Sequence, residues 1–462
     1  MTDVRIAHDT MGEMELPADA LWGASTQRAV LNFPVSGQPV PAEIVHAMAL
    51  LKWAAATANQ ETGVIDATQG DAIRSAADEV IGGQLDRHFP IDVFQTGSGT
   101  STNMNANEVI ANRAKQLLGE PLESNAVHPN DHVNASQSSN DTFPSACHIA
   151  VGTLTVHQLI PALEQLAASL GRKATAWKDV VKPGRTHLMD ATPVTLGQEF
   201  GGYQRQIVLG VRRLRNALAS IEELALGGTA VGTGLNCPPG FASRTIGLVA
   251  ERTGIGFREA EDHFEAQGSR DALVDLSAAC KTIAVSLIKI ANDVRWLSSG
   301  PRTGLFEISL PAIQPGSSIM PGKVNPVIPE AVRQVGAQVI GNDAAVTVGG
   351  LSGELELNVM IPMMATNVVT SIKLLASVSK IFVTKCLEET VATDEGPKAV
   401  ERSLMSVTAL VPEIGYERSA KLAKLAFANN QTLREAAIAD GVDEAILDRV
   451  LNYAAMAEGG IL

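Results

Sequence analysis

The sequence is poor in the residues that mark several protein classes. It has four cysteines and no CxxC pair, which predicts reduced core thiols rather than a disulfide or metal framework. Aromatic residues make up only 4%, whereas aliphatic residues dominate, and this composition favours helices over sheets. No run approaches eighteen uninterrupted apolar residues, and the first residues lack the apolar core of a signal peptide. We therefore expect a soluble, cytoplasmic protein.

Positive charge is also scarce. Thirty-six Lys and Arg residues stand against fifty Asp and Glu, which gives a formal net charge of −14. Such a balance argues against nucleic acid or an anionic membrane as a partner. It does not exclude an acidic small molecule, because a local basic pocket can override the field of distant charges.

The helical patterns and the Pro and Gly breaks along the chain predict an all-α protein of three consecutive domains. Residues 1–138 mix short helical patterns with Pro and Gly breaks, residues 139–393 hold helical patterns of unusual length, and residues 394–462 hold short amphipathic ones. The long patterns predict a central helix bundle. They cover Thr153–Asp179, Leu196–Ala225, Asp271–Ser299, Pro329–Thr347 and Glu354–Glu389.

The pattern at Asp271–Ser299 is the clearest of these. Apolar residues recur at alternating steps of three and four along the whole segment, the spacing of a helix packed lengthwise in a bundle. A second apolar face includes Val274, Val285 and Ile288. A helix that is apolar on two sides lies inside a bundle rather than on its surface.

One connector is too specialised for a simple link between helices. Gly316–Pro326 reads GSSIMPGKVNP and combines glycines, hydroxyls and one lysine. Backbone N–H groups around Ser317, Ser318 and Gly322 can form an anion-binding nest, to which Lys323 adds a full charge. The alternative is a flexible surface loop, as most Gly- and Ser-rich loops are.

Three more polar stretches interrupt the apolar background. Thr96–Glu108 lacks the glycine spacing of a nucleotide-binding loop. In His128–Ala146, His128 and His132 have the spacing of a metal pair on a helix, but Pro129 favours a turn and no third ligand follows. We predict no metal.

Lys182–Phe200 carries His187 beside Arg185 and Thr186, and we expect a loop at the mouth of the bundle there. Gly227–Asn236 follows a helix rather than a strand, so the pattern favours a glycine-dependent turn near the site over a dinucleotide site.

The Gly316–Pro326 segment resembles the GSSxMPxKxNP signature of the fumarase/aspartase superfamily at every fixed position. The resemblance extends from His8–Pro17 to Ile414–Lys424. It implies a three-domain fold around a long-helix bundle, a homotetramer whose active sites are shared between subunits, a small dicarboxylate as substrate, and no cofactor.

The resemblance also implies roles for single residues. The catalytic residues would be His187, Ser317 and Glu330, with Ser317 removing a proton and Glu330 polarising His187. Chemistry alone favours His187 as the base, since a neutral serine is a poor one. The implied substrate contacts are Ser98, Gly99, Thr100, Ser138, Ser139, Asn140, Thr186, Ser318, Lys323, Val324 and Asn325. A second, peripheral dicarboxylate site would comprise His128, Pro129, Asn130 and Asp131, although Asn125 stands where many relatives have a basic residue.

Two positions point to the fumarase branch. Relatives that add water show Thr-His where this chain has Thr186 and His187, whereas aspartases show Thr-Gln; Gly322 is alanine in most aspartases. The implied reaction is reversible hydration of fumarate to (S)-malate, a step of the tricarboxylic acid cycle, through an aci-carboxylate intermediate. Aspartate ammonia-lyase activity is the alternative. A non-catalytic protein on the same scaffold is a further one, but it would be free to lose Ser317, Lys323 or His187.

Overall fold

The computed structural model describes residues 4–460, and this part of the chain is mostly helical. It contains eighteen α-helices, and its ten strands form five two-stranded sheets. The predicted all-α class is therefore confirmed, with small hairpins that the sequence pattern did not predict.

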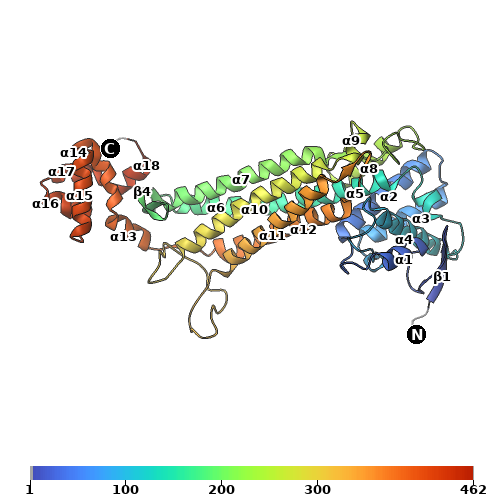
Figure 1. Ribbon diagram of the computed structural model, residues 1–462, viewed down its shortest axis with the longest axis horizontal. Coiled ribbons are helices and arrows are strands. Elements are labelled where there is room, and N and C mark those ends of the chain that lie inside the picture. The colour runs from blue at the N-terminus through green and yellow to red at the C-terminus, as the bar shows by residue number, and fades with distance from the viewer. Residues whose placement is uncertain (1–3, 461–462) are drawn as a thin grey trace. The chain divides into compact units, whose positions relative to one another are not determined.

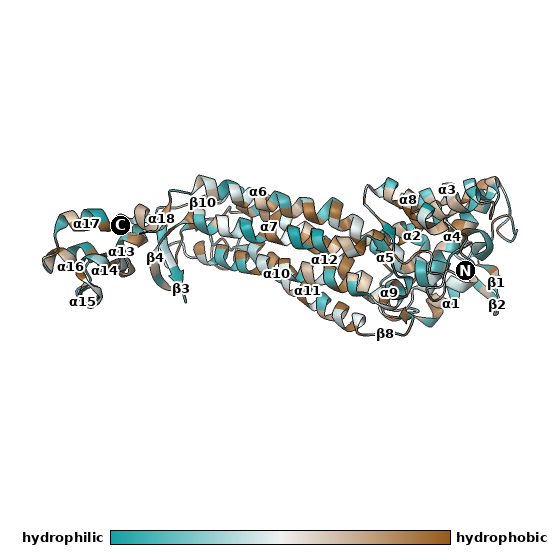
Figure 2. Ribbon diagram, turned by 90° about the horizontal axis from the view of Figure 1, so that it is seen from above, coloured by the Kyte–Doolittle hydropathy of each residue, from teal (hydrophilic) through white to brown (hydrophobic). Residues whose placement is uncertain are grey.

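The long helices are largely those predicted. They are α5 (Ser139–Leu154), which continues through η3 (Thr155–Leu159) into α6 (Ile160–Ala176), then α7 (Leu196–Ile221), α10 (Asp271–Leu297), α11 (Val327–Gly350) and α12 (Ile361–Phe382), which continues into η4 (Val383–Leu387). Apolar residues recur along the length of α6 and α11 (Figure 2).

Two predicted boundaries were wrong. The helix expected from Thr153 begins at Ser139, because Ser138 caps it and Asp141 completes a capping box. The helix expected from Glu354 begins at Ile361, because the preceding residues form a hairpin of β8 (Gly353–Glu354) and β9 (Leu357–Asn358).

Helix α10 confirms the spacing argument. The eight residues of its main apolar face are all buried: Leu273, Leu276, Cys280, Ile283, Leu287, Ile290, Val294 and Leu297. Its second apolar face is only half covered within one chain, and Val285 remains 53% exposed.

The chain divides into two compact units that interleave along the sequence. The first unit comprises Met1–Pro161, Arg212–Thr282 and Ala337–Ala376, and the second comprises Ala162–Val211, Ile283–Gly336 and Ser377–Leu462. Within each unit, segments of the long helices lie side by side (Figure 1). The three consecutive domains suggested by the sequence stay a prediction.

The first unit also holds the short N-terminal elements, among which α2 packs against α3, α5 and α8. The elements are β1 (Val4–Asp9), β2 (Gly12–Pro17), α1 (Ala24–Asn32), α2 (Ala42–Glu61), α3 (Ala67–Ile81), η1 (Asp86–His88), α4 (Thr100–Leu118), η2 (Pro129–Val133), β5 (Glu223–Leu224), α8 (Phe241–Thr253), β6 (Arg258–Glu259) and α9 (His263–Gly268).

The second unit contains a β-hairpin and the C-terminal helices, which surround a small core of their own that includes Leu422, Leu433 and Leu447. The elements are β3 (Val181–Thr186), β4 (Met189–Thr195), β7 (Ile308–Ser309), β10 (Val391–Ala392), α13 (Glu395–Arg402), η5 (Leu404–Leu410), α14 (Val411–Ile414), α15 (Tyr416–Ala428), α16 (Leu433–Ala439), α17 (Glu444–Val450) and α18 (Tyr453–Glu458). The short C-terminal helices predicted from the sequence are confirmed.

Two helical stretches are long and apolar enough, by length and composition alone, to cross a membrane. They are Ser139–Ala176 and Ile361–Leu387, and the most apolar window of each is 72% and 61% buried within the protein. Core helices of soluble proteins meet the same criterion, so this finding is weak evidence for a membrane span.

Candidate active site

Two helix N-termini meet in the first unit and bring several predicted site residues together. Helix α4 begins at Thr100 and α5 begins at Ser139. The Thr100 Oγ1 lies 2.8 Å from both Ser98 Oγ and Ser139 Oγ, so the three hydroxyls form one chain. Helix N-termini carry unpaired N–H groups and partial positive charge. The arrangement is suited to a carboxylate.

Glycines allow the backbone to reach this geometry. Gly99, the N-cap of α4, has a φ of +77°, and a Cβ there would lie 2.2 Å from the Phe143 ring. A Cβ on Gly97 would lie 1.6 Å from the Val359 carbonyl oxygen. Neither position can hold another residue without moving its neighbours.

Asp141 anchors the second of the two helix N-termini. This buried carboxylate accepts N–H bonds from Ser138 at 3.0 Å, Gly227 at 3.1 Å and Thr229 at 2.9 Å. Burial raises the pKa of Asp141, against the opposing effect of these N–H donors. The predicted glycine-dependent turn therefore lies beside the site, and the Asn140 Nδ2 donates to the Ala230 carbonyl at 2.8 Å.

The predicted peripheral residues lie at the start of η2 and line a cavity beside the N-terminus of α4. The cavity, of about 710 Å³, is lined by Thr100 and by His128, Pro129 and Asn130, among others. The His128 Nδ1 accepts the N–H of Asp131 at 3.1 Å, and the N–H of His128 in turn donates to the Nδ1 of His132 at 2.9 Å. These bonds engage both rings within the turn. In residues 4–460, no group of three or more His, Cys, Asp or Glu side chains could hold a metal ion.

His187 lies in a short loop, as expected, and this loop is the turn of a β-hairpin. Thr186 pairs with Met189, so His187 and Leu188 are the two central residues of the turn between β3 and β4. Their φ angles are +56° and +59°, as in a type I′ turn, which normally takes Asn-Gly. A strained backbone at an exposed histidine is typical of functional sites.

A buried ion cluster holds strand β3 of this hairpin in place. Glu307 is 2% exposed; its carboxylate lies 2.8 Å from Arg185 Nη1 and 3.1 Å from Lys182 Nζ. Lys182 also donates to Glu199 at 2.7 Å. Burial raises the pKa of Glu199, and the nearby Lys182 opposes this shift. The cluster fixes the strand that leads to His187.

The signature loop has a defined internal geometry. Its ends are joined by the N–H of Gly316, which donates to the Lys323 carbonyl, and by the Asn325 Nδ2, which donates to the Gly316 carbonyl, both at 2.7 Å. A Cβ on Gly316 would lie 2.6 Å from the Lys323 carbonyl oxygen, and Gly322 has a φ of +81°. The Ser317 Oγ accepts two backbone N–H bonds, from Ile319 at 3.2 Å and Met320 at 3.0 Å.

The predicted catalytic residues lie on three separate segments of the chain, namely the β3–β4 turn, the signature loop and α11. Glu330 lies in the first turn of α11, as predicted, and donates its N–H to Pro326. Among the described residues, no hydrogen bond or ion pair joins Glu330, His187 and Ser317. Lys323 and Ser318 are exposed, as are the loop side chains Ile319, Met320 and Val324.

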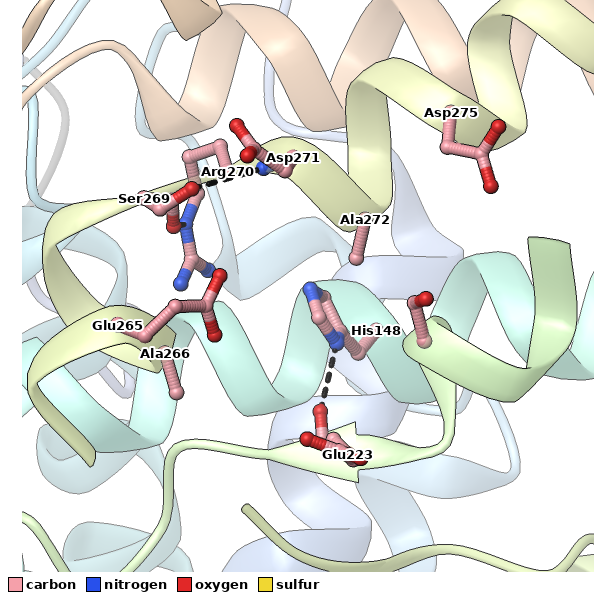
Figure 3. Close-up of a pocket in the computed structure, with 10 residues that line it drawn as sticks. His148, Glu223, Glu265, Ala266, Ser269, Arg270, Asp271, Ala272 and Asp275 are labelled. Atoms are coloured by element: carbon pink, nitrogen blue, oxygen red, sulfur yellow. Dashed lines mark hydrogen bonds between the residues drawn. The ribbon is translucent and has the colours of Figure 1, made fainter. Parts of the chain in front are cut away.

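Another cavity, of about 440 Å³, is lined by none of the predicted site residues. His148 and Arg270 point into it from α5 and from the start of α10 (Figure 3). The His148 Nδ1 lies 2.9 Å from the Glu223 carbonyl oxygen, and burial lowers the pKa of His148 to about 3. Burial likewise lowers the pKa of Arg270 to about 10. The hydroxyl-rich site lies elsewhere.

Sequence reasoning missed several supporting residues, namely Lys52, Asp141 and Glu307. Lys52 stands alone in the apolar run AMALLKWAAA. A single charge in such a run can indicate a buried, paired side chain. Glu307 gave no such signal, since its partners are distant in sequence.

The chain matches known lyases over most of its length. The model of the lyase family matches residues 12–341, and that of the fumarase C C-terminus matches residues 407–458. The protein is therefore a lyase by family.

Individual relatives narrow the class. The class II fumarate hydratase of Corynebacterium efficiens is 54% identical, covering 98% of this chain and 97% of the relative. The class II fumarate hydratase of Halobacterium salinarum is 52% identical, and the match covers 100% of this chain and 98% of the relative. The crystal structure of class II fumarase from Schistosoma mansoni matches with a TM-score of 0.96 at 39% identity. The match covers 98% of this chain and 99% of that chain. The chain belongs to the class II fumarate hydratase family.

Proposed function

We propose that this protein is a fumarate hydratase, which adds water reversibly across the double bond of fumarate to give (S)-malate. The observation that carries the proposal is the meeting of the α4 and α5 N-termini. There the hydroxyls of Ser98, Thr100 and Ser139 form a chain within hydrogen-bond distance. Such a site suits one carboxylate of a dicarboxylate. Membership of the class II fumarate hydratase family supports the same reaction.

In the dehydration direction, the first step removes a proton from the carbon next to a carboxylate. We assign this step to Ser317. Its Oγ already accepts the N–H groups of Ile319 and Met320, and the same donors would stabilise an ionised oxygen. The electron pair left on carbon spreads into the carboxylate as the aci-form. Lys323, Asn325 and Asn140 are suitable donors for this additional negative charge.

The second step removes the hydroxyl group as water, which needs a proton. We assign that proton to His187, acting through a water and oriented by Glu330. In the hydration direction the same histidine accepts the proton of the attacking water. A glutamine cannot exchange a proton in this way, so His187 favours hydration over ammonia addition.

We further propose that the protein is a homotetramer whose sites are shared between subunits. Two observations support this. The signature loop exposes apolar side chains beside its reactive groups, with Ile319 83% and Met320 48% exposed. The long helices also expose apolar residues that a second copy would cover, among them Trp296 on α10 and Val348 on α11. Three consecutive domains and a cytoplasmic location, which suits the free cysteines, complete the proposal.

The direct test is a spectroscopic one. The purified protein is mixed with (S)-malate, and the ultraviolet absorbance of fumarate is followed, with L-aspartate as the control substrate. We expect absorbance to rise with malate and to stay constant with aspartate. A rise with aspartate alone would assign the protein to the ammonia-lyase branch. No rise with either would contradict the proposed function.

A further inference from the structure

Lys52 places an amine in the interior of the first unit. It lies in the middle of α2 with no exposed surface. Its Nζ donates to the Asn134 Oδ1 at 2.9 Å and to the Gln137 Oε1 at 3.0 Å. Both acceptors lie on the short turn that leads from the peripheral residues to Ser138. The lysine therefore holds the segment that precedes α5.

Asn134 connects the same lysine to α4. Its Oδ1 accepts from Asn103 Nδ2 at 3.1 Å and from Asn107 Nδ2 at 3.2 Å, in addition to Lys52. Asn103 and Asn107 lie on the inner face of α4, whose first residue is Thr100. One amide oxygen thus joins α2, α4 and the turn before α5.

Gln137 completes the connection to α5. Its Oε1 accepts from Lys52, its backbone oxygen accepts from the Asn134 Nδ2 at 3.1 Å, and its own Nε2 donates to the Ala135 carbonyl at 3.0 Å. The next residue, Ser138, caps α5. Any shift of Gln137 therefore moves the N-terminus of that helix.

This arrangement is unfavourable for stability by itself. The Oδ1 atoms of Asn103 and Asn107 are buried without a partner, and leaving a buried acceptor unpaired is unfavourable. Burying a lysine carries a further desolvation cost, and burial lowers the pKa of Lys52 to about 7. The Asp141 carboxylate on α5 opposes this shift, because a nearby negative charge raises the pKa of the lysine. An apolar residue at position 52 would avoid the lysine's cost, so stability alone does not account for a lysine there.

We propose that Lys52 is a positioning residue, which through Asn134 and Gln137 holds the N-termini of α4 and α5 at the spacing that binds a dicarboxylate. The inference rests on the proposed function, since it assigns the substrate to those two helix ends. Lys52 does not touch the substrate. It fixes the distance between Thr100 and Ser139, whose hydroxyls lie 2.8 Å apart.

The test is Lys52→Met, which keeps the unbranched shape of the side chain up to the fourth atom and removes the amine with its charge and donors. We expect KM for fumarate and malate to rise about tenfold or more, from the loss of the two hydrogen bonds that the amine donates. We also expect the melting temperature to be no lower than that of the wild type. Lys115→Met is the matched control. Lys115 is also buried and donates to the Leu122 carbonyl at 2.7 Å, away from the turn, so its KM should stay unchanged.

A double-mutant cycle tests whether Lys52 acts through Asn134. Asn134→Leu alone should raise KM about as much as Lys52→Met, and the double variant should have a KM only slightly higher than either single variant. If the free-energy effects of the two substitutions on KM add up in the double variant, or if Lys52→Met has the wild-type KM, the proposal is wrong. A drop in melting temperature with unchanged KM would assign Lys52 a structural role only and overturn it as well.

Binding of succinate, an unreactive dicarboxylate, separates this proposal from the proposed function. The readout is the shift in melting temperature that succinate causes in each variant. If the wild type hydrates no fumarate but binds succinate, a smaller shift in Lys52→Met still supports the positioning role. If the wild type neither binds succinate nor hydrates fumarate, both proposals are wrong. An equal shift in the wild type and Lys52→Met would contradict the positioning role alone.

Discussion

The Ser317 Oγ accepts the backbone N–H of Met320 at 3.0 Å, so the side chain assigned as base is already surrounded by donors. The N–H of Ile319 adds a second donor at 3.2 Å. A serine oxygen held in this way is closer to the environment of an oxyanion than to that of a free hydroxyl. The loop that carries it is closed by Gly316 and Asn325 and does not depend on packing against a core.

Ser317→Ala should therefore fold and assemble normally and lose most of its kcat. We expect a loss of about 10²–10⁴-fold, the usual contribution of a general base, with little change in KM. Steady-state kinetics on malate and the melting temperature measure both effects. A variant that kept near wild-type kcat would refute the assignment, and Ser318 would then be tested.

His187→Gln should abolish hydration without creating ammonia-lyase activity. Glutamine cannot exchange the proton that water addition requires, and the other donors would remain suited to a hydroxyl. Absorbance assays with malate and with aspartate measure the two activities. Appreciable deamination of aspartate by this variant would mean that residue 187 alone separates the two branches, contrary to our interpretation.

A mixture of two inactive variants should recover activity if sites are shared. Ser317→Ala and His187→Asn are unfolded together and reassembled at equal ratio; asparagine suits the positive φ of position 187. A site works when its loop and its histidine come from different variants, so about a quarter of wild-type activity should return. A mixed tetramer as inactive as its parents would show that one chain supplies both residues.

Glu307→Gln should destabilise the second unit. The substitution removes the carboxylate that pairs with Arg185 and one of the two that pair with Lys182, and breaking a buried ion pair costs about 3–5 kcal/mol. Urea denaturation measures the free energy of unfolding. Glu199→Gln is the control and should lower the free energy of unfolding less, because the Glu199 side chain is 26% exposed. An equal decrease in both variants would show that Glu307 has no special role in holding the hairpin.

The stability of the protein should depend on pH through Lys52. Burial lowers its pKa to about 7 from 10.5, so between these values the unfolded chain binds more protons than the folded one. The free energy of unfolding contributed by this group therefore rises with pH across that window. Lys52→Met should gain more stability over the wild type at pH 6 than at pH 9. Lys424→Met, an exposed control, should follow the wild type at both; a constant gain for Lys52→Met would contradict the shift.

The sequence predicted the elements whose signal is periodic. The apolar spacing of α10 predicted its start at Asp271 and its buried face, whereas its end, expected at Ser299, lies at Leu297. Packing along a bundle imposes one pattern on the whole helix. The hairpin at His187 escaped prediction because its strands are short and its turn holds His-Leu rather than Asn-Gly. The capped start of α5 was missed because polar capping residues look like a loop.

The residues of the site were predictable by motif, but their supports were not. Ser317 and His187 lie in recognisable strings, whereas the partners of Glu307 lie more than a hundred residues away in sequence. Pairing over such distances depends on the packed fold and leaves no local trace. Lys52 left a weak one, a single charge in an apolar run.

The paired N-termini of α4 and α5 have a practical consequence. Their partial positive charge and hydroxyls favour the charge and oxygens of an anion rather than the carbon skeleton between them. Phosphate and sulfate from assay buffers and crystallisation solutions will therefore compete with substrate. The apparent KM measured in such buffers would be too high, and amine buffers with chloride as counter-ion are the better choice.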